Sequence, residues 1–140
     1  MGFLQSFGDN MVLQRAPAKA AVYGVYGPQA TAPKTAKVKV TVRSTTGESY
    51  SVDAEMNTVH QATVDPNYAA CTECPGPYAT WKALLHPTEA GGDYTILANC
   101  TGCGGDPKYW GTSITNVTFG DVWHCSGQVR SRNSFCTRPV

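Results

Sequence analysis

The stretch KVKVTVRS, from Lys37 to Ser44, decides the fold class of this sequence. Its residues alternate strictly between apolar and polar, which is the pattern of a strand with one buried and one solvated face. The expected inward residues are Val38, Val40 and Val42, and the expected outward residues are Lys37, Lys39, Thr41 and Arg43. The turn TTGE (Thr45–Glu48) and the segment SYSVDA (Ser49–Ala54) follow, so we expect a β-hairpin here.

Further short strands are predicted on both sides of this hairpin, and helical periodicity is nearly absent. They are MVLQ, Ala20–Gly27, His60–Val64, Tyr78–Leu85, Asp93–Cys100 and Thr112–Phe119. The turn His86–Gly92 predicts that Tyr78–Leu85 and Asp93–Cys100 form a second hairpin. The whole series predicts an all-β protein, an antiparallel β-sandwich of immunoglobulin-like or jelly-roll-like type.

Two glycosylation sequons fall on predicted strands, at Asn99 and Asn116. In the strand Asp93–Cys100, the alternation places Cys100 inside and Asn99 outside, where a glycan has room. Asn116 shares its face with Ile114, so either Ile114 is exposed or the strand contains a β-bulge.

Composition limits the classes of function. The chain has 140 residues, of which 41% are hydrophobic and 15% charged, and its net charge is +1. This charge does not suggest a nucleic-acid partner, and no apolar run has the length of a membrane span. Met1–Ser6 lacks the features of a secretory signal peptide.

Four of the six cysteines form two C-x-x-C pairs, Cys71 with Cys74 and Cys100 with Cys103. Four thiolates in this arrangement can hold zinc, but the spacer is longer than the ~15–20 residues usual in zinc ribbons. The sequons favour a secretory route and therefore disulfides. Pairing of Cys71 with Cys103 and of Cys74 with Cys100 would join the two loops. We expect no metal and no cofactor.

The remaining candidate side chains are more typical of structure than of chemistry. His60, His86 and His124 have no carboxylate at a metal-like spacing, and Trp81 and Trp123 are expected in the core. Trp110 follows a turn, where an exposed tryptophan can stack on a sugar, although packing at the rim of the core is the commoner role.

The segment GDVWHCSGQ (Gly120–Gln128) predicts a buried strand that ends in the sharp turn Ser126–Gly127. A strand running into a glycine turn is how α/β hydrolases present a nucleophile. After it, VRSRNSFCTRPV (Val129–Val140) is basic and has no strand pattern.

Three stretches resemble the amino-terminal region of the sialate O-acetylesterase family: Phe7–Tyr26, Trp81–Ile96 and Asn116–Gln128. The specific motifs are DNMVLQ and FGDVWHCSGQ. The resemblance implies a β-sandwich at 1–119, the first strand of an α/β SGNH-type esterase domain at 120–128, and a divergent tail at 129–140. It also implies O-acetylated sialoglycans as the substrate and a secreted or lysosomal location.

In that family, the residue after the glutamine of S-G-Q is the nucleophilic serine. Here Ser126, Gly127 and Gln128 are followed by Val129, which has no hydroxyl group. We therefore expect an amino-terminal fragment of such an esterase that is cut off before its nucleophile, through a missed splice or a frame shift, and that does not hydrolyse esters. A genuine short variant is the other explanation of the tail.

Two other functions remain open at this point. One is a secreted β-sandwich that binds carbohydrate through exposed aromatic residues such as Trp110 and Tyr109, without catalysis. The other is a cytosolic zinc-binding protein.

Overall fold

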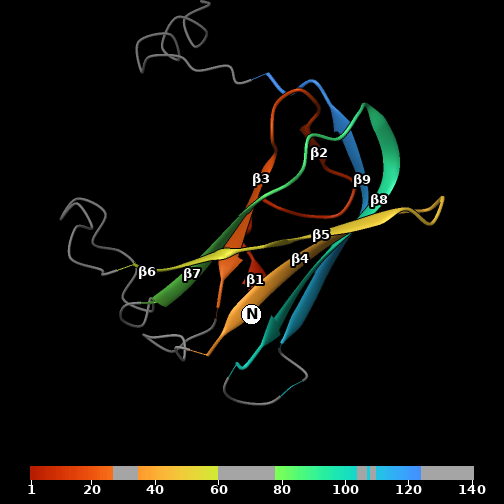
Figure 1. Cartoon of the computed structure of the whole chain (residues 1–140). Helices are drawn as coiled ribbons and strands as arrows, with labels where there is room; N and C mark the ends of the chain where they lie inside the picture. The colour runs from red at the N-terminus through yellow and green to blue at the C-terminus, as the bar shows by residue number, and fades with distance from the viewer. Residues whose placement is uncertain (27–34, 60–77, 104–106, 108–109, 124–140) are drawn as a thin grey trace, which may run out of the picture.

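A computed structural model describes residues 1–26, 35–59, 78–103, 107 and 110–123. These residues form nine strands in two sheets, with no α-helix among them. The strands are β1 (Gly2–Phe3), β2 (Val12–Gln14), β3 (Ala21–Val25), β4 (Lys37–Ser44), β5 (Ser49–Asp53), β6 (Glu55–Val59), β7 (Tyr78–Leu84), β8 (Gly91–Thr101) and β9 (Gly111–Gly120). The prediction of an all-β sandwich is confirmed (Figure 1).

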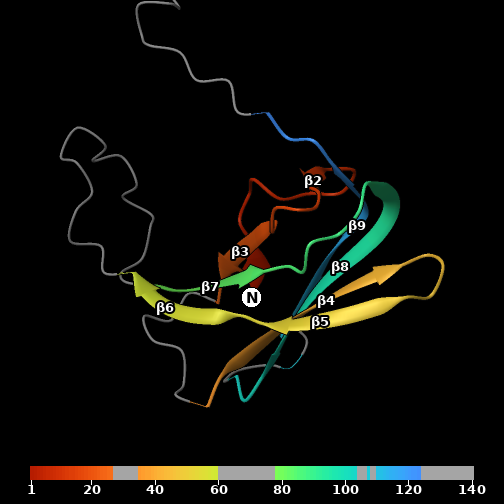
Figure 2. The ribbon, with the colours of Figure 1, turned by 45° about the horizontal axis from the view of Figure 1, so that its top comes forward.

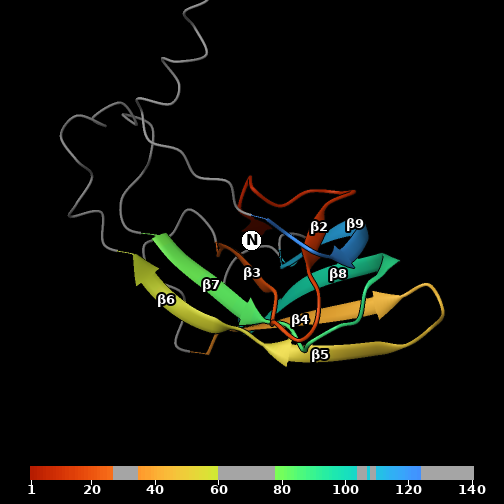
Figure 3. The same cartoon turned by 90° about the horizontal axis from the view of Figure 1, so that it is seen from above.

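One sheet has four strands in the order β1-β3-β7-β6, and the other has five in the order β2-β9-β8-β4-β5. All neighbours are antiparallel except β2 and β9, which run parallel. Figure 3, seen from above, shows β6 and β7 to one side of β4 and β8. The predicted β4–β5 hairpin is present, with Val40 opposite Val52.

The core lies between the two sheets, and the alternation of β4 supplies one side of it. Val38, Val40 and Val42 are all buried, while Lys37, Lys39 and Arg43 on the opposite face are exposed. Burial of a valine side chain contributes about 1.5–3 kcal/mol, so the alternation fixes which face of this strand packs inward.

Trp81 is the largest buried side chain and forms the centre of the four-stranded sheet's contribution to the core. It is fully buried, as predicted, and its ring meets the Phe3 ring edge-on with centroids 5.2 Å apart. Gly24 lies opposite Trp81 on β3. A Cβ atom at Gly24 would overlap the Gly2 carbonyl and come within 2.6 Å of the Trp81 ring, so this position has no room for a side chain.

The predicted hairpin between Tyr78–Leu85 and Asp93–Cys100 is wrong. β7 belongs to the four-stranded sheet and β8 to the five-stranded sheet, so the segment His86–Ala90 crosses from one sheet to the other. A second crossing occurs at Ala54, where β5 ends in one sheet and β6 begins in the other. Figure 2 shows these two strands as a nearly continuous ribbon. β6 was not predicted, and the predicted strand His60–Val64 lies outside the described residues.

The bulge considered at Asn116 is present in β9. Ile96 pairs with Ile114, whereas Tyr94 pairs with Val117, so β9 has one extra residue in this interval. Asn116 adopts a positive φ of 53°, which lets Ile114 and Val117 both point inward although three positions separate them. Asn116 itself is exposed.

Candidate functional site

The two motifs that carry the family resemblance lie side by side in the structure. β2, within DNMVLQ, pairs in parallel with the end of β9, with Leu13 opposite Phe119 and Gln14 opposite Gly120. Leu13 and Phe119 are both buried. The buried pair Leu13–Phe119 therefore fixes β2 against β9 in the five-stranded sheet, and both strands end at the same edge of the molecule.

The residues before β2 hold the bulge of β9. The Asp9 carboxylate accepts hydrogen bonds from the Thr115 amide at 2.7 Å and the Thr115 hydroxyl at 3.0 Å. The Asn116 side-chain amide donates to the Asn10 side-chain oxygen at 2.6 Å. Asn10, like Asn116, has a positive φ, of 63°, a conformation that asparagine tolerates better than most residues. The aspartate and asparagine of DNMVLQ thus bind the two neighbouring residues Thr115 and Asn116 in the bulge of β9.

The residues at the end of β2 hold the segment that follows β9. The Arg15 amide donates to the Gly120 carbonyl at 2.9 Å, and the Arg15 guanidinium binds both carboxylate oxygens of Asp121, at 2.8 and 3.3 Å. The hydrogen bond and charge of Asp121 raise the pKa of Arg15 above its usual value. One residue further on, the Val122 amide donates to the Gln14 side-chain oxygen at 3.2 Å.

Asp121, Val122 and Trp123 are called the exit segment here, because they carry the chain away from the sandwich (Figure 1). The prediction that this segment continues as a buried strand is wrong for these three residues, which form no strand. Trp123, expected in the core, is 85% exposed, and Val122 and the neighbouring Val12 are each 50% exposed. Among the residues that the structure describes, no strand lies beside the exit segment to bury these side chains. An apolar surface of this kind is typical of a contact with another part of a protein.

The positions expected around the nucleophile, Ser126, Gly127, Gln128 and Val129, lie outside the described residues, as do His60, His124 and Tyr109. His86 is exposed in the crossing between β7 and β8, as expected of a solvated residue. Its ring stacks on Tyr50, with centroids 4.5 Å apart and an interplanar angle of 12°. The Tyr50 hydroxyl lies 3.1 Å from the Thr88 hydroxyl, and burial raises the pKa of Tyr50.

Cys100 and Cys103 are joined to each other by a disulfide, with Cα atoms 6.0 Å apart. This differs from the expected pairing across the two C-x-x-C motifs, whose other members, Cys71 and Cys74, lie outside the described residues. A sulfur atom in a disulfide is not a thiolate and does not ligate zinc in the usual way. In the described part of the chain, no group of three or more histidine, cysteine or acidic side chains is placed to hold a metal ion.

Trp110 is only partly exposed, because it packs against the core cluster. Its carbonyl accepts a hydrogen bond from the Cys100 amide at 2.7 Å. Asn99, the other sequon residue, is exposed on β8, as predicted from the alternation. Among the described residues there is no helix long and apolar enough to cross a membrane.

Comparison with known proteins confirms the resemblance. The sialate O-acetylesterase of Rattus norvegicus is 32% identical to the chain over 124 residues, which is 88% of this chain and 18% of the relative. The chain is similar to sialate O-acetylesterases. The protein of that name from Homo sapiens is 29% identical over 126 residues, or 90% of this chain and 19% of the relative.

The chain spans about a fifth of the length of the curated sialate O-acetylesterases that it matches. No protein-family model matches it. The similarity therefore concerns a part of these enzymes, and this part includes most of the residues that build the sandwich described above.

Proposed function

We propose that the sandwich is the amino-terminal accessory domain of an esterase of the sialate O-acetylesterase type. On this proposal, the whole enzyme removes O-acetyl groups from sialic acids, and the sandwich holds the segment that leads to the nucleophile. The observation that carries the proposal is the parallel pairing of β2 with the end of β9. This pairing places the motif DNMVLQ beside the start of the motif FGDVWHCSGQ, and the exit segment leaves the sandwich directly after the paired strands.

The exposed apolar side chains of Val12, Val122 and Trp123 support the same proposal. Their burial against a following esterase domain would stabilise the junction, since burial of apolar surface contributes about 25 cal/mol per Å². The Arg15–Asp121 ion pair would fix the direction in which the chain enters that domain. We propose that this apolar contact and this ion pair are the reason why the sandwich and the catalytic domain occur in one protein.

This chain is proposed to be inactive by itself, because Val129 occupies the position expected for the serine. In a serine esterase, the serine oxygen attacks the acetyl carbonyl, the sugar hydroxyl leaves, and water then releases acetate. Valine has no atom that can accept the acetyl group in the first step. The purified chain should release no acetate from an O-acetylated sialic acid beyond a heat-denatured control.

An immunoprecipitation tests the proposed function in the natural source. An antibody against the β4–β5 hairpin should precipitate a protein several times longer than this chain, and the precipitate should release acetate from O-acetylated sialic acid. A precipitate that contains this sandwich only as a short protein without esterase activity would contradict the proposal.

We also propose a secreted or lysosomal location with N-glycans on Asn99 and Asn116. Both side chains are exposed. Protein secreted from animal cells should lose mass on enzymatic removal of N-glycans, and the variants Asn99→Gln and Asn116→Gln should each remove one glycan. The alternative function, a carbohydrate-binding module that uses Trp110, has less support because Trp110 packs partly against the core.

A further inference from the structure

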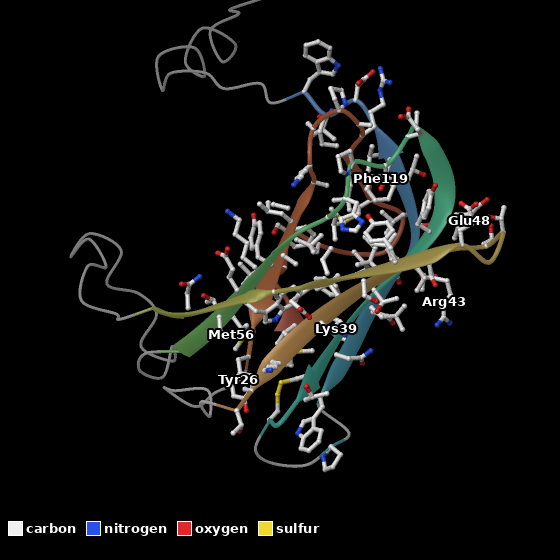
Figure 4. All side chains as sticks on the ribbon, in the orientation of Figure 1. Tyr26, Lys39, Arg43, Glu48, Met56 and Phe119 are labelled. Atoms are coloured by element: carbon white, nitrogen blue, oxygen red, sulfur yellow. A yellow bond between two sulfur atoms is a disulfide. The ribbon has the colours of Figure 1, made fainter. Side chains whose placement is uncertain are left out.

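The outer face of β4 carries three cations at alternating positions, Lys37, Lys39 and Arg43. All three are exposed, because their alternate neighbours are the buried valines. Figure 4 shows Arg43 extending from β4 on the side away from β3 and β7. The cations therefore stand on the solvent face of the five-stranded sheet, opposite the core.

The flanking strands present short polar side chains beside these cations. Lys39 lies between Asp53 on β5 and Asn99 on β8, and Lys37 lies opposite Thr101. The result is a depression of about 350 Å³, which we call the outer-face depression. It is lined by Lys37, Lys39, Thr41, Asp53, Asn99 and Thr101.

Positive charge is in excess at this depression. Asp53 is the acid on its wall, and Glu48 lies in the turn at the far end of the hairpin. Among the described residues, the ion pair within 4.0 Å is that of Arg15 with Asp121. The carboxylate oxygens of Asp53 and Glu48 therefore lie farther than 4.0 Å from the nitrogen atoms of the cations on this face. The ammonium groups of Lys37 and Lys39 are thus available to an outside anion.

We propose that the outer-face depression binds an acidic sugar, with the carboxylate of the sugar at Lys37 and Lys39. The identification of this sugar as a sialic acid rests on the proposed function. Lysine ammonium groups form charge-assisted hydrogen bonds with carboxylates. The Asn99 amide, the Thr101 hydroxyl and the Asp53 carboxylate supply the donors and acceptors that sugar hydroxyl groups need. In molecules without a glycan on Asn99, the site would hold a sialoglycan at the end of β8 opposite to the exit segment.

Asn99 lies inside the depression, so an N-glycan on Asn99 would fill the space that the ligand needs. The two uses of this surface exclude each other in one molecule. Binding is therefore to be measured on protein without N-glycans, for example protein made in the bacterial periplasm, where disulfides form.

The test is a titration of this protein with 3′-sialyllactose, with lactose as the neutral control and a glucuronate disaccharide as a second acid. Sialyllactose should bind at least tenfold more tightly than lactose, since one charged hydrogen-bonded group corresponds to about tenfold or more in affinity. Lys39→Gln should remove this preference. Lys82→Gln, the same change at an exposed position of the other sheet, should retain it. The preference should also fall as salt screens the exposed charges.

Equal binding of sialyllactose and lactose, or a preference that survives Lys37→Gln and Lys39→Gln together, would overturn the proposal. Equal binding of sialyllactose and the glucuronate would support the acidic-sugar site and make uronic acids its ligand as well. A failed titration alongside a precipitate with esterase activity would reject the site and leave the proposed function standing. Binding of sialyllactose alongside a precipitate without esterase activity would support the site and reject the proposed function.

Discussion

Arg15 and Asp121 form a two-point ion pair across 106 residues of sequence, with Nε–Oδ1 and Nη2–Oδ2 distances of 2.8 and 3.3 Å. Arg15 directly follows β2, and Asp121 directly follows β9. The pair therefore continues the parallel pairing of these strands by one further step. It defines where the chain leaves the sandwich.

The first prediction concerns the exit segment. Gln14→Ala removes the acceptor of the Val122 amide, and Arg15→Gln removes the ion pair, so amide hydrogen exchange at Val122 should become faster in both variants. The free energy of unfolding should change little, because the ion pair and this hydrogen bond are exposed to solvent. Gln14→Glu retains an acceptor oxygen and is the matched control. Unchanged exchange in Gln14→Ala would show that this hydrogen bond does not hold the segment.

The second prediction concerns the contact between Gly24 and Trp81. Gly24→Ala should lower the free energy of unfolding by about 1–3 kcal/mol, the usual cost of overpacking, because the new Cβ meets the Gly2 carbonyl and the Trp81 ring. Gly8→Ala is the control, since a Cβ atom there meets nothing within 4 Å. Urea unfolding of both variants measures the difference. Equal stability would contradict this close contact, because neighbouring strands of the four-stranded sheet would then admit the Cβ atom without cost.

The third prediction concerns the bulge in β9. Asn116→Ala and Asn116→Gly both lose the hydrogen bond with Asn10 and both lose the sequon. Only alanine is strained at a φ of 53°, and the left-handed conformation costs a residue with a Cβ roughly 1–2 kcal/mol. The alanine variant should therefore be less stable than the glycine variant by about 1 kcal/mol in unglycosylated protein. The reverse order of stability would contradict the bulge.

The fourth prediction concerns alkaline pH. Burial raises the pKa of Tyr50 in the folded protein, so between the unfolded pKa of about 10 and the higher folded pKa the native state binds more protons than the unfolded state. The stabilisation from neutral Tyr50 is thus fully present below about pH 10 and is lost as the pH rises through the folded pKa.

The variant Tyr50→Phe tests this pH dependence. It should lower the free energy of unfolding by about 0.5–1.5 kcal/mol at neutral pH, because it loses the hydrogen bond of the Tyr50 hydroxyl. Its stability should then fall less steeply than that of the parent above pH 10, as measured by urea unfolding at several pH values. Parallel pH curves for the two proteins would contradict the shift.

Local sequence pattern was sufficient for several of the strands and for the faces that they bury, although β1 and β6 were not predicted. β4 was predicted because Val38, Val40 and Val42 alternate with polar residues, and the bulge was one of two alternatives because Asn116 and Ile114 compete for one face. The switch of sheet at Ala54 left no such signal. Tyr50, Val52 and Met56 are all half-buried, so the period of two continues through the crossing.

Pairing between distant strands was beyond the sequence pattern. The turn signals of His86–Gly92 do not distinguish a hairpin from a crossing between sheets. The parallel pair of β2 and β9 depends on tertiary packing of Leu13 and Phe119. Trp123 was wrongly placed in the core because its local pattern is that of a buried strand, whereas burial also requires a neighbouring strand.

The measurement that tests the central claim most directly is the sequence of the transcripts across the codon of Gln128. If the sandwich is the accessory domain of an esterase, transcripts should exist in which Ser126, Gly127 and Gln128 are followed by serine, asparagine and methionine and then by a long esterase reading frame. If every transcript encodes Val129 after Gln128, the esterase account is contradicted, and the sandwich acts without a catalytic domain.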